Sequence, residues 1–176
     1  MIPVLIHIAN IYSEKGDQDV ALFNLKEAEK IAVEEGGDPN TKMKLLALKG
    51  LIYERKGDDN NALKYEYEQL KIAEIIYDEP TIAGALSNIA KIHFNKKDYL
   101  TSIELLGKAI NLYDKLNFYI EKANQLSNLA FLHQTLNNKR MALDYSLQAY
   151  KIYEDFGLEK IEVCISLKKM IDSLKA

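Results

Sequence analysis

Apolar residues recur along the chain at the spacing of one face of an α-helix. Leu86, Ile89, Ala90 and His93 follow the i, i+3, i+4, i+7 pattern, and the same spacing returns after residue 98. The 8 glycines and 3 prolines leave few breaks, and the sequence shows no strand-like alternation. The pattern therefore predicts helices with the approximate ranges 3–15, 18–35, 39–56, 59–77, 80–96, 99–116, 119–136, 139–156 and 158–174.

The predicted helices come in pairs that repeat about every 40 residues. Each pair is joined by a short polar turn, and the four turns are marked by Gly16-Asp17, Gly57-Asp58, Lys97-Asp98 and Asn137. A small residue precedes each turn by seven positions, namely Ala9, Gly50, Ala90 and Ala130. The aspartates of the turns are predicted to cap the helices that follow them. The chain is thus expected to form four hairpins, at 2–37, 38–78, 79–117 and 118–157.

A single helical hairpin cannot cover its own apolar face, so hairpins of this kind stack on one another. We therefore expect an all-α fold in which residues 1–176 form one domain, an α-solenoid of four hairpins. The terminal helix, at 158–174, is predicted to cap the fourth hairpin with its apolar stripe. The residues of that stripe are Ile161, Cys164, Ile165, Leu167 and Met170.

The repeated pattern resembles the tetratricopeptide repeat (TPR). The resemblance is carried by segments such as Ile8-Ala9-Asn10-Ile11-Tyr12 and Leu126-Ser127-Asn128-Leu129-Ala130, and it covers nearly the whole chain. The usual period of this family is about 34 residues, and the longer period here resembles the variant of kinesin light chains, peptide-pheromone receptors and bacterial sensor proteins. The resemblance to this family implies a right-handed superhelix. The second hairpin departs from the family pattern with Lys49, Glu66 and Gln69.

Composition and charge argue against several other classes of function. The 23 basic and 26 acidic residues give a net charge of -3, which disfavours nucleic acid or an anionic membrane as a partner. No apolar run is long enough for a membrane helix, and a cytoplasmic protein is expected. Cys164 is the single cysteine and is predicted to be buried and unreactive, while His93 and His133 are predicted to be structural. No catalytic, metal or cofactor motif is present, so we expect neither an enzyme nor a bound cofactor.

The family resemblance implies that the first helices of the hairpins line a concave groove. Asn88 and Asn128 share one repeat position there, and an asparagine amide can pair with both the C=O and the N–H of a peptide. The sequence therefore predicts a non-catalytic scaffold that holds a protein or an extended peptide. The predicted groove residues are Asn10, Leu51, Arg55, Ser87, Asn88, Lys91, Asn95, Asn124, Ser127, Asn128, Phe131 and Thr135.

Two alternatives stay open at this point. The chain could be the ligand-sensing regulatory segment of a larger bacterial signalling protein, such as a sensor kinase or a peptide-pheromone-type regulator. A homodimer could also form through the first hairpin, because no preceding helix is predicted to cover it.

Overall fold

The computed structural model describes residues 1–175, and these form nine helices with no β-strand. The repeated apolar pattern gives each helix a buried stripe, and the polar turns end it. The helices are α1 (Ile2–Glu14), α2 (Gln18–Glu34), α3 (Pro39–Arg55), α4 (Asp59–Ile75), α5 (Glu79–Asn95), α6 (Tyr99–Lys115), α7 (Tyr119–Thr135), α8 (Lys139–Asp155) and α9 (Glu162–Lys175). The predicted all-α fold is thus confirmed.

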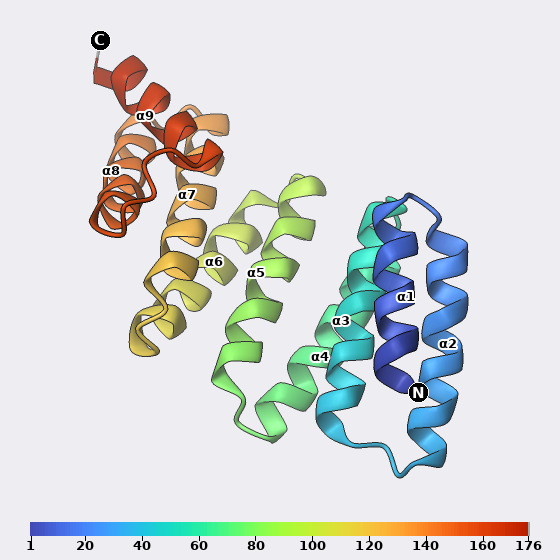
Figure 1. Cartoon of the computed structure of the whole chain (residues 1–176). Helices are drawn as coiled ribbons and strands as arrows, with labels where there is room; N and C mark the ends of the chain where they lie inside the picture. Colours follow the sequence, from blue (N-terminus) through green and yellow to red (C-terminus); the bar gives the residue numbers. More distant parts are fainter. Residues whose placement is uncertain (176) are drawn as a thin grey trace. The chain divides into compact units, whose positions relative to one another are not determined.

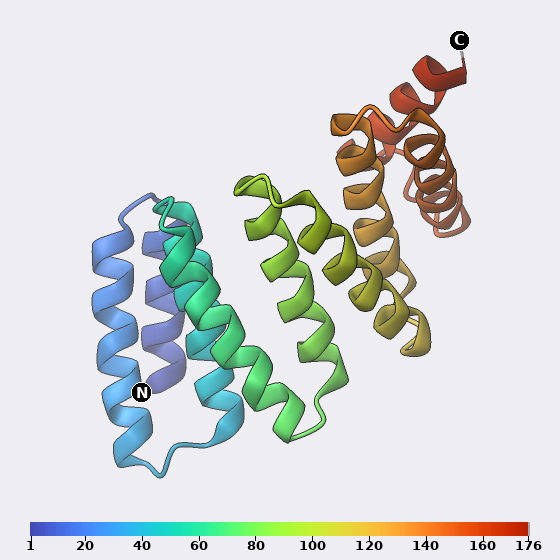
Figure 2. The ribbon, with the colours of Figure 1, turned by 180° about the vertical axis from the view of Figure 1, so that it is seen from behind.

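The chain divides into two compact units, Met1–Ile92 and His93–Ala176. In the first unit, α1 pairs with α2 and α3 pairs with α4 as antiparallel hairpins, and α2 packs against α3 (Figures 1 and 2). Fully buried side chains of Ala9, Ala21, Leu25, Ala28 and Ile52 form its core. The small residues allow the paired helices to approach closely.

In the second unit, α7 pairs with α8, α6 packs against α7, and α9 packs against α8. Its core contains Ala130, Ala142, Tyr153, Cys164 and Leu167, all of them fully buried. The predicted role of the last helix as a cover for the fourth hairpin therefore holds, and so does the burial of the single cysteine.

The turns repeat in backbone conformation as well as in sequence. The predicted turn positions Gly16, Gly57, Lys97 and Asn137 all have positive φ, between 56° and 87°. Positive φ is costly for a residue with a side chain. The glycines of the first two turns adopt it at little cost, whereas Lys97 and Asn137 adopt it at a higher cost.

The residues after these turns cap the second helices. The carboxylates of Asp17, Asp58 and Asp98 accept hydrogen bonds from the backbone N–H groups of the first helical turn, as predicted. Asn138 does the same for α8 at 3.4 Å, which the sequence analysis did not anticipate. Each cap satisfies a backbone donor that has no partner within its helix.

The last helix is the element whose start the sequence analysis misplaced. It begins at Glu162 rather than at residue 158, because the chain turns after Gly157 before the helix starts. Ile161 and Ile165 were predicted to face the fourth hairpin, but they are 36% and 44% exposed. Ile165 follows the buried Cys164 by one residue, about 100° around the helix, and so it lies off the buried stripe.

Candidate peptide-binding groove

The first helices of the first unit are tied to one another by charged side chains. Arg55 on α3 donates a hydrogen bond from Nη1 to Oγ of Ser13 on α1, over 2.6 Å. Lys91 on α5 forms an ion pair of 2.6 Å with Oε1 of Glu54 on α3. Two predicted groove residues, Arg55 and Lys91, are thus each bonded to a side chain of the preceding first helix.

The other predicted groove residues of this unit are accessible to different degrees. Asn10 and Leu51 are half-buried, whereas Asn88 is exposed. The hydroxyl of Ser87 donates to the carbonyl of Ala83 over 2.9 Å within its own helix, so it is already engaged.

Asn88 rests on a buried carboxylate that the sequence analysis did not place in the site. Its Nδ2 atom lies 3.2 Å from Oε1 and 3.3 Å from Oε2 of Glu66, which projects from α4. Glu66 is only 2% exposed. A Cβ atom on Gly50 would lie 2.7 Å from Glu66 Oε1, so the glycine makes room for the carboxylate.

The surroundings of Glu66 favour its neutral form. Burial raises the pKa of the Glu66 carboxyl to about 7, and the negative charge of Glu54 acts in the same direction, while the hydrogen bond from Asn88 opposes the shift. A carboxyl at this position therefore changes its charge close to neutral pH.

In the second unit, α7 carries the predicted groove residues. Asn124, Asn128 and Thr135 are exposed, and Phe131 is half-buried. The Tyr153 hydroxyl donates to Oδ1 of Asn124 over 2.6 Å, which turns the Asn124 amide nitrogen away from α8. Nδ2 of Asn128 donates to Oε1 of Gln125, one turn earlier on the same helix, over 3.0 Å.

The two remaining predicted residues of this unit, Ser127 and Asn95, differ from each other in exposure. Ser127 lies inside the hairpin with 1% exposure, contrary to its predicted place on the groove. Ser127 directly precedes the exposed Asn128, so its side chain lies about 100° away around the helix. Its hydroxyl donates to the carbonyl of Ala123. Asn95, at the end of α5, is exposed.

The remaining candidates for chemistry serve the fold. His133 is buried and stacks on Tyr145 with ring centroids 5.4 Å apart, and burial lowers its pKa. His93 Nδ1 lies 2.9 Å from Oδ2 of Asp98 at the turn. Burial raises the pKa of the Cys164 thiol, which leaves little thiolate near neutral pH.

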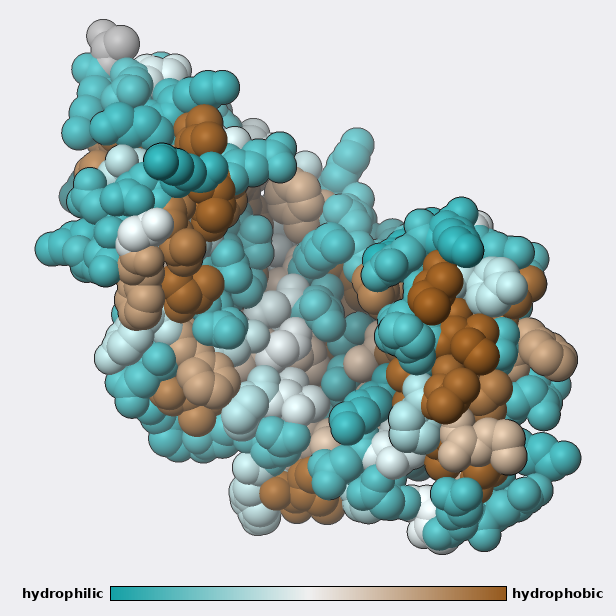
Figure 3. Space-filling view, viewed as in Figure 1, coloured by the Kyte–Doolittle hydropathy of each residue, from teal (hydrophilic) through white to brown (hydrophobic). Residues whose placement is uncertain are grey.

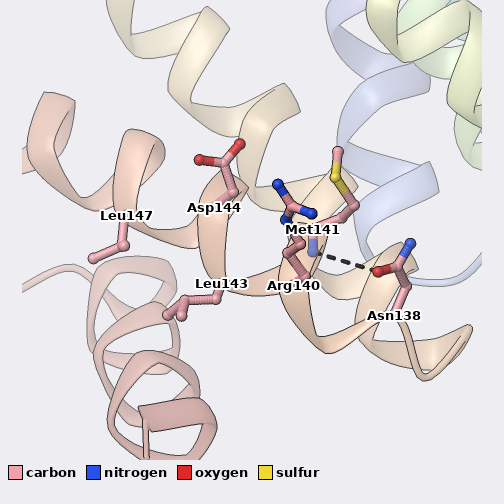
Figure 4. Close-up of a pocket in the computed structure, with 6 residues that line it drawn as sticks. All are labelled: Asn138, Arg140, Met141, Leu143, Asp144 and Leu147. Carbon is pink, nitrogen blue, oxygen red and sulfur yellow. Dashed lines mark hydrogen bonds between the residues drawn. The ribbon is translucent and has the colours of Figure 1, made fainter.

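Within residues 1–175 there is no cluster of three or more metal-ligating side chains. In the same range no helix is long and apolar enough to cross a bilayer. A surface hollow lies on α8, lined by Asn138, Arg140, Met141, Leu143, Asp144 and Leu147 (Figure 4). The hydrogen bond drawn there is the cap that Asn138 makes to the backbone N–H of Met141. None of these residues belongs to the predicted groove.

Two sequence models, both described as tetratricopeptide repeat, match residues 81–155 and residues 2–32. Together they span more than half of the chain, which belongs to the tetratricopeptide repeat proteins. Its repeat of about 40 residues is longer than the usual period of about 34. Repeats of this family generally mediate protein–protein interactions, and the chain is accordingly an interaction scaffold. No curated protein sequence matches it significantly.

Solved structures with low sequence identity share the fold. BtubC (BKLC) from P. vanneervenii has 18% identity and a TM-score of 0.74, with 96% of this chain and 78% of that chain covered. A Signal Transduction ATPase with Numerous Domains (STAND) protein from Pyrococcus horikoshii, with a tetratricopeptide repeat sensor, has 18% identity and a TM-score of 0.86. The match covers 98% of this chain and 26% of that chain. Aspartyl phosphate phosphatase F from Bacillus subtilis has 12% identity and a TM-score of 0.84, with coverages of 98% and 48%.

Proposed function

We propose that the first-helix faces within each unit of this chain bind an extended peptide segment of a partner protein without catalysing a reaction. The observation that carries the proposal is the set of exposed asparagines at repeat positions, Asn88, Asn124 and Asn128, each already held by a neighbouring side chain. An amide held in one orientation loses little conformational freedom when it pairs with a peptide backbone. The half-buried Leu51 and Phe131 would add apolar contacts.

The experiment needs a peptide probe, because the partner is unidentified. A peptide selected from a random library displayed on phage against the intact chain would serve, with affinity measured by calorimetry. Replacing Asn88 or Asn128 by alanine should weaken binding about 3- to 10-fold, since each substitution removes a hydrogen bond to the peptide. Asn111→Ala is the matched control, because Asn111 is exposed on α6, a second helix. Equal affinity of all three variants and the wild type would remove the proposal.

A second candidate function is ligand sensing within a larger signalling protein. The observation that favours it is the likeness to the STAND protein with a tetratricopeptide repeat sensor, of which the chain covers 26%. This function requires that binding change the arrangement of the helices. Small-angle scattering with and without the selected peptide would test it, and identical scattering curves would argue for a static scaffold.

Self-association is a third candidate, and it concerns the apolar face of α1. Val4 is 61% exposed and Ile11 37% exposed, whereas the equivalent residues of α3, Leu45 and Ile52, are buried at 3% and 0%. Figure 3 shows apolar side chains gathered on the front of the first unit. A second copy could cover this face. Light scattering at several concentrations should then show a dimer that Val4→Glu abolishes, and a concentration-independent monomer would refute it.

A further inference from the structure

The contact between Glu66 and Asn88 links a buried titratable group to an exposed groove residue. Both oxygens of the Glu66 carboxylate lie within hydrogen-bond distance of the Asn88 amide nitrogen, at 3.2 and 3.3 Å. In a planar side-chain amide, the oxygen and the nitrogen point in different directions from the same carbon. Because Nδ2 of Asn88 faces Glu66, Oδ1 is directed away from Glu66. Asn88 is exposed, so this oxygen is offered to a ligand.

An ionised carboxylate can hold the amide in this orientation only. It accepts hydrogen bonds and donates none, so the amide nitrogen must face it. A protonated carboxyl carries one O–H donor, which can pair with Oδ1 of Asn88 instead. The amide could then present its nitrogen to the groove, and the groove position would change from an acceptor to a donor.

The charge of Glu66, rather than its other neighbours, sets the orientation of the Asn88 amide. On α3, Gly50 supplies space rather than a polar contact, and Glu54 is the acidic group whose field reaches Glu66. On α5, Lys91 is ion-paired with Glu54 at 2.6 Å, so its charge is already compensated there. The hydrogen bonds that the structure gives to the Glu66 carboxylate come from Asn88.

We propose that Glu66 is a positioning residue that makes Asn88 a hydrogen-bond acceptor, so that this part of the groove selects a ligand N–H group. The proposal rests on the proposed peptide-binding function and deepens it, because it states which backbone group of the peptide is recognised at Asn88. It also predicts that protonation of Glu66 relaxes this selection, with a transition in the neutral range.

The first test measures hydrogen-bond polarity with N-methylated peptides. The probe is the phage-selected peptide, synthesised with one backbone N–H at a time replaced by N-methyl. At about pH 8.5, where the carboxylate is largely ionised, one of these replacements should cost the wild type about tenfold in affinity. That loss should disappear in Asn88→Ala. In Glu66→Gln, and in the wild type at about pH 5.5, it should shrink to about threefold or less, because a neutral group no longer fixes the amide.

Glu104→Gln is the matched control, since Glu104 is an exposed glutamate on α6 and its replacement should leave the N-methyl profile and its pH dependence unchanged. An N-methyl loss that depends on Asn88 but is equal in the wild type and Glu66→Gln would overturn the role of Glu66 and leave peptide binding intact. If replacing Asn88 and replacing Asn128 by alanine both leave the peptide affinity unchanged, the groove itself is refuted.

A second measurement needs no ligand. In nuclear magnetic resonance spectra of the intact chain, the side-chain amide signals of Asn88 should titrate with the same midpoint as the carboxyl carbon of Glu66, and they should be constant in Glu66→Gln. Asn88 signals that stay constant while Glu66 titrates would overturn the proposal, whether or not a peptide has been found.

Discussion

Replacing Glu66 by glutamine should stabilise the protein at alkaline pH. Glu66 is 2% exposed, and burial raises its pKa from the ordinary 4.5 to about 7. Glutamine has nearly the same shape, and its amide oxygen can still accept the hydrogen bond from Asn88. The substitution therefore removes a charge that is costly to bury while it keeps the local packing.

The size of the effect follows from the shift in pKa. One pKa unit corresponds to about 1.4 kcal/mol, so a rise from 4.5 to about 7 corresponds to about 3 kcal/mol. The direction of the pH effect on stability depends on whether Glu66 loses its proton first in the unfolded or in the native chain. As pH rises above 4.5, Glu66 ionises in the unfolded chain but stays protonated in the native one, so the wild type loses stability until pH exceeds about 7.

The assay is urea unfolding of both proteins, followed by helical circular dichroism from about pH 4 to about pH 9. Groups common to both proteins cancel in the difference between their free energies of unfolding. That difference should be small at about pH 4 and should grow to about 2–3 kcal/mol in favour of Glu66→Gln above about pH 8. A difference that does not depend on pH would show that Glu66 ionises normally, and it would refute the account of its burial.

Three further predictions concern the turns, the caps and the thiol. Lys97→Gly should raise the free energy of unfolding by about 1 kcal/mol because Lys97 has a φ of 63°. Lys151→Gly, inside α8, should lower it by about 1 kcal/mol, and urea unfolding measures both. Asn138→Ala should lower it by about 1 kcal/mol through loss of the α8 cap, and an unchanged midpoint would contradict that role. Cys164 should react with a thiol reagent far more slowly in the folded protein than in urea, and equal rates would show that it is accessible.

The hairpins could be predicted because they depend on local sequence signals. Asp17, Asp58 and Asp98 follow their turns directly, and the capping bonds that they accept span three residues. The exposed repeat positions of Asn88 and Asn128 likewise follow from helical spacing alone. The start of α9 was misplaced because residues 158–161 keep the apolar pattern while the backbone turns.

The partners that hold the groove asparagines could not be predicted in the same way. Glu66 contacts Asn88 across 22 residues and Tyr153 contacts Asn124 across 29, so both depend on how the helices stack. One signal was available, because Glu66 breaks the apolar pattern of its helix. A carboxylate that is buried in this way requires a polar partner on a neighbouring helix.

The central claim is that the exposed asparagines of the first helices contact a bound peptide, and side-chain amide resonances report this most directly. On titration with the selected peptide, the account predicts that the signals of Asn88, Asn124 and Asn128 shift in proportion to binding, while the signals of Asn111 on α6 stay in place. A peptide that binds and shifts Asn111, while those three asparagines remain unchanged, would contradict it.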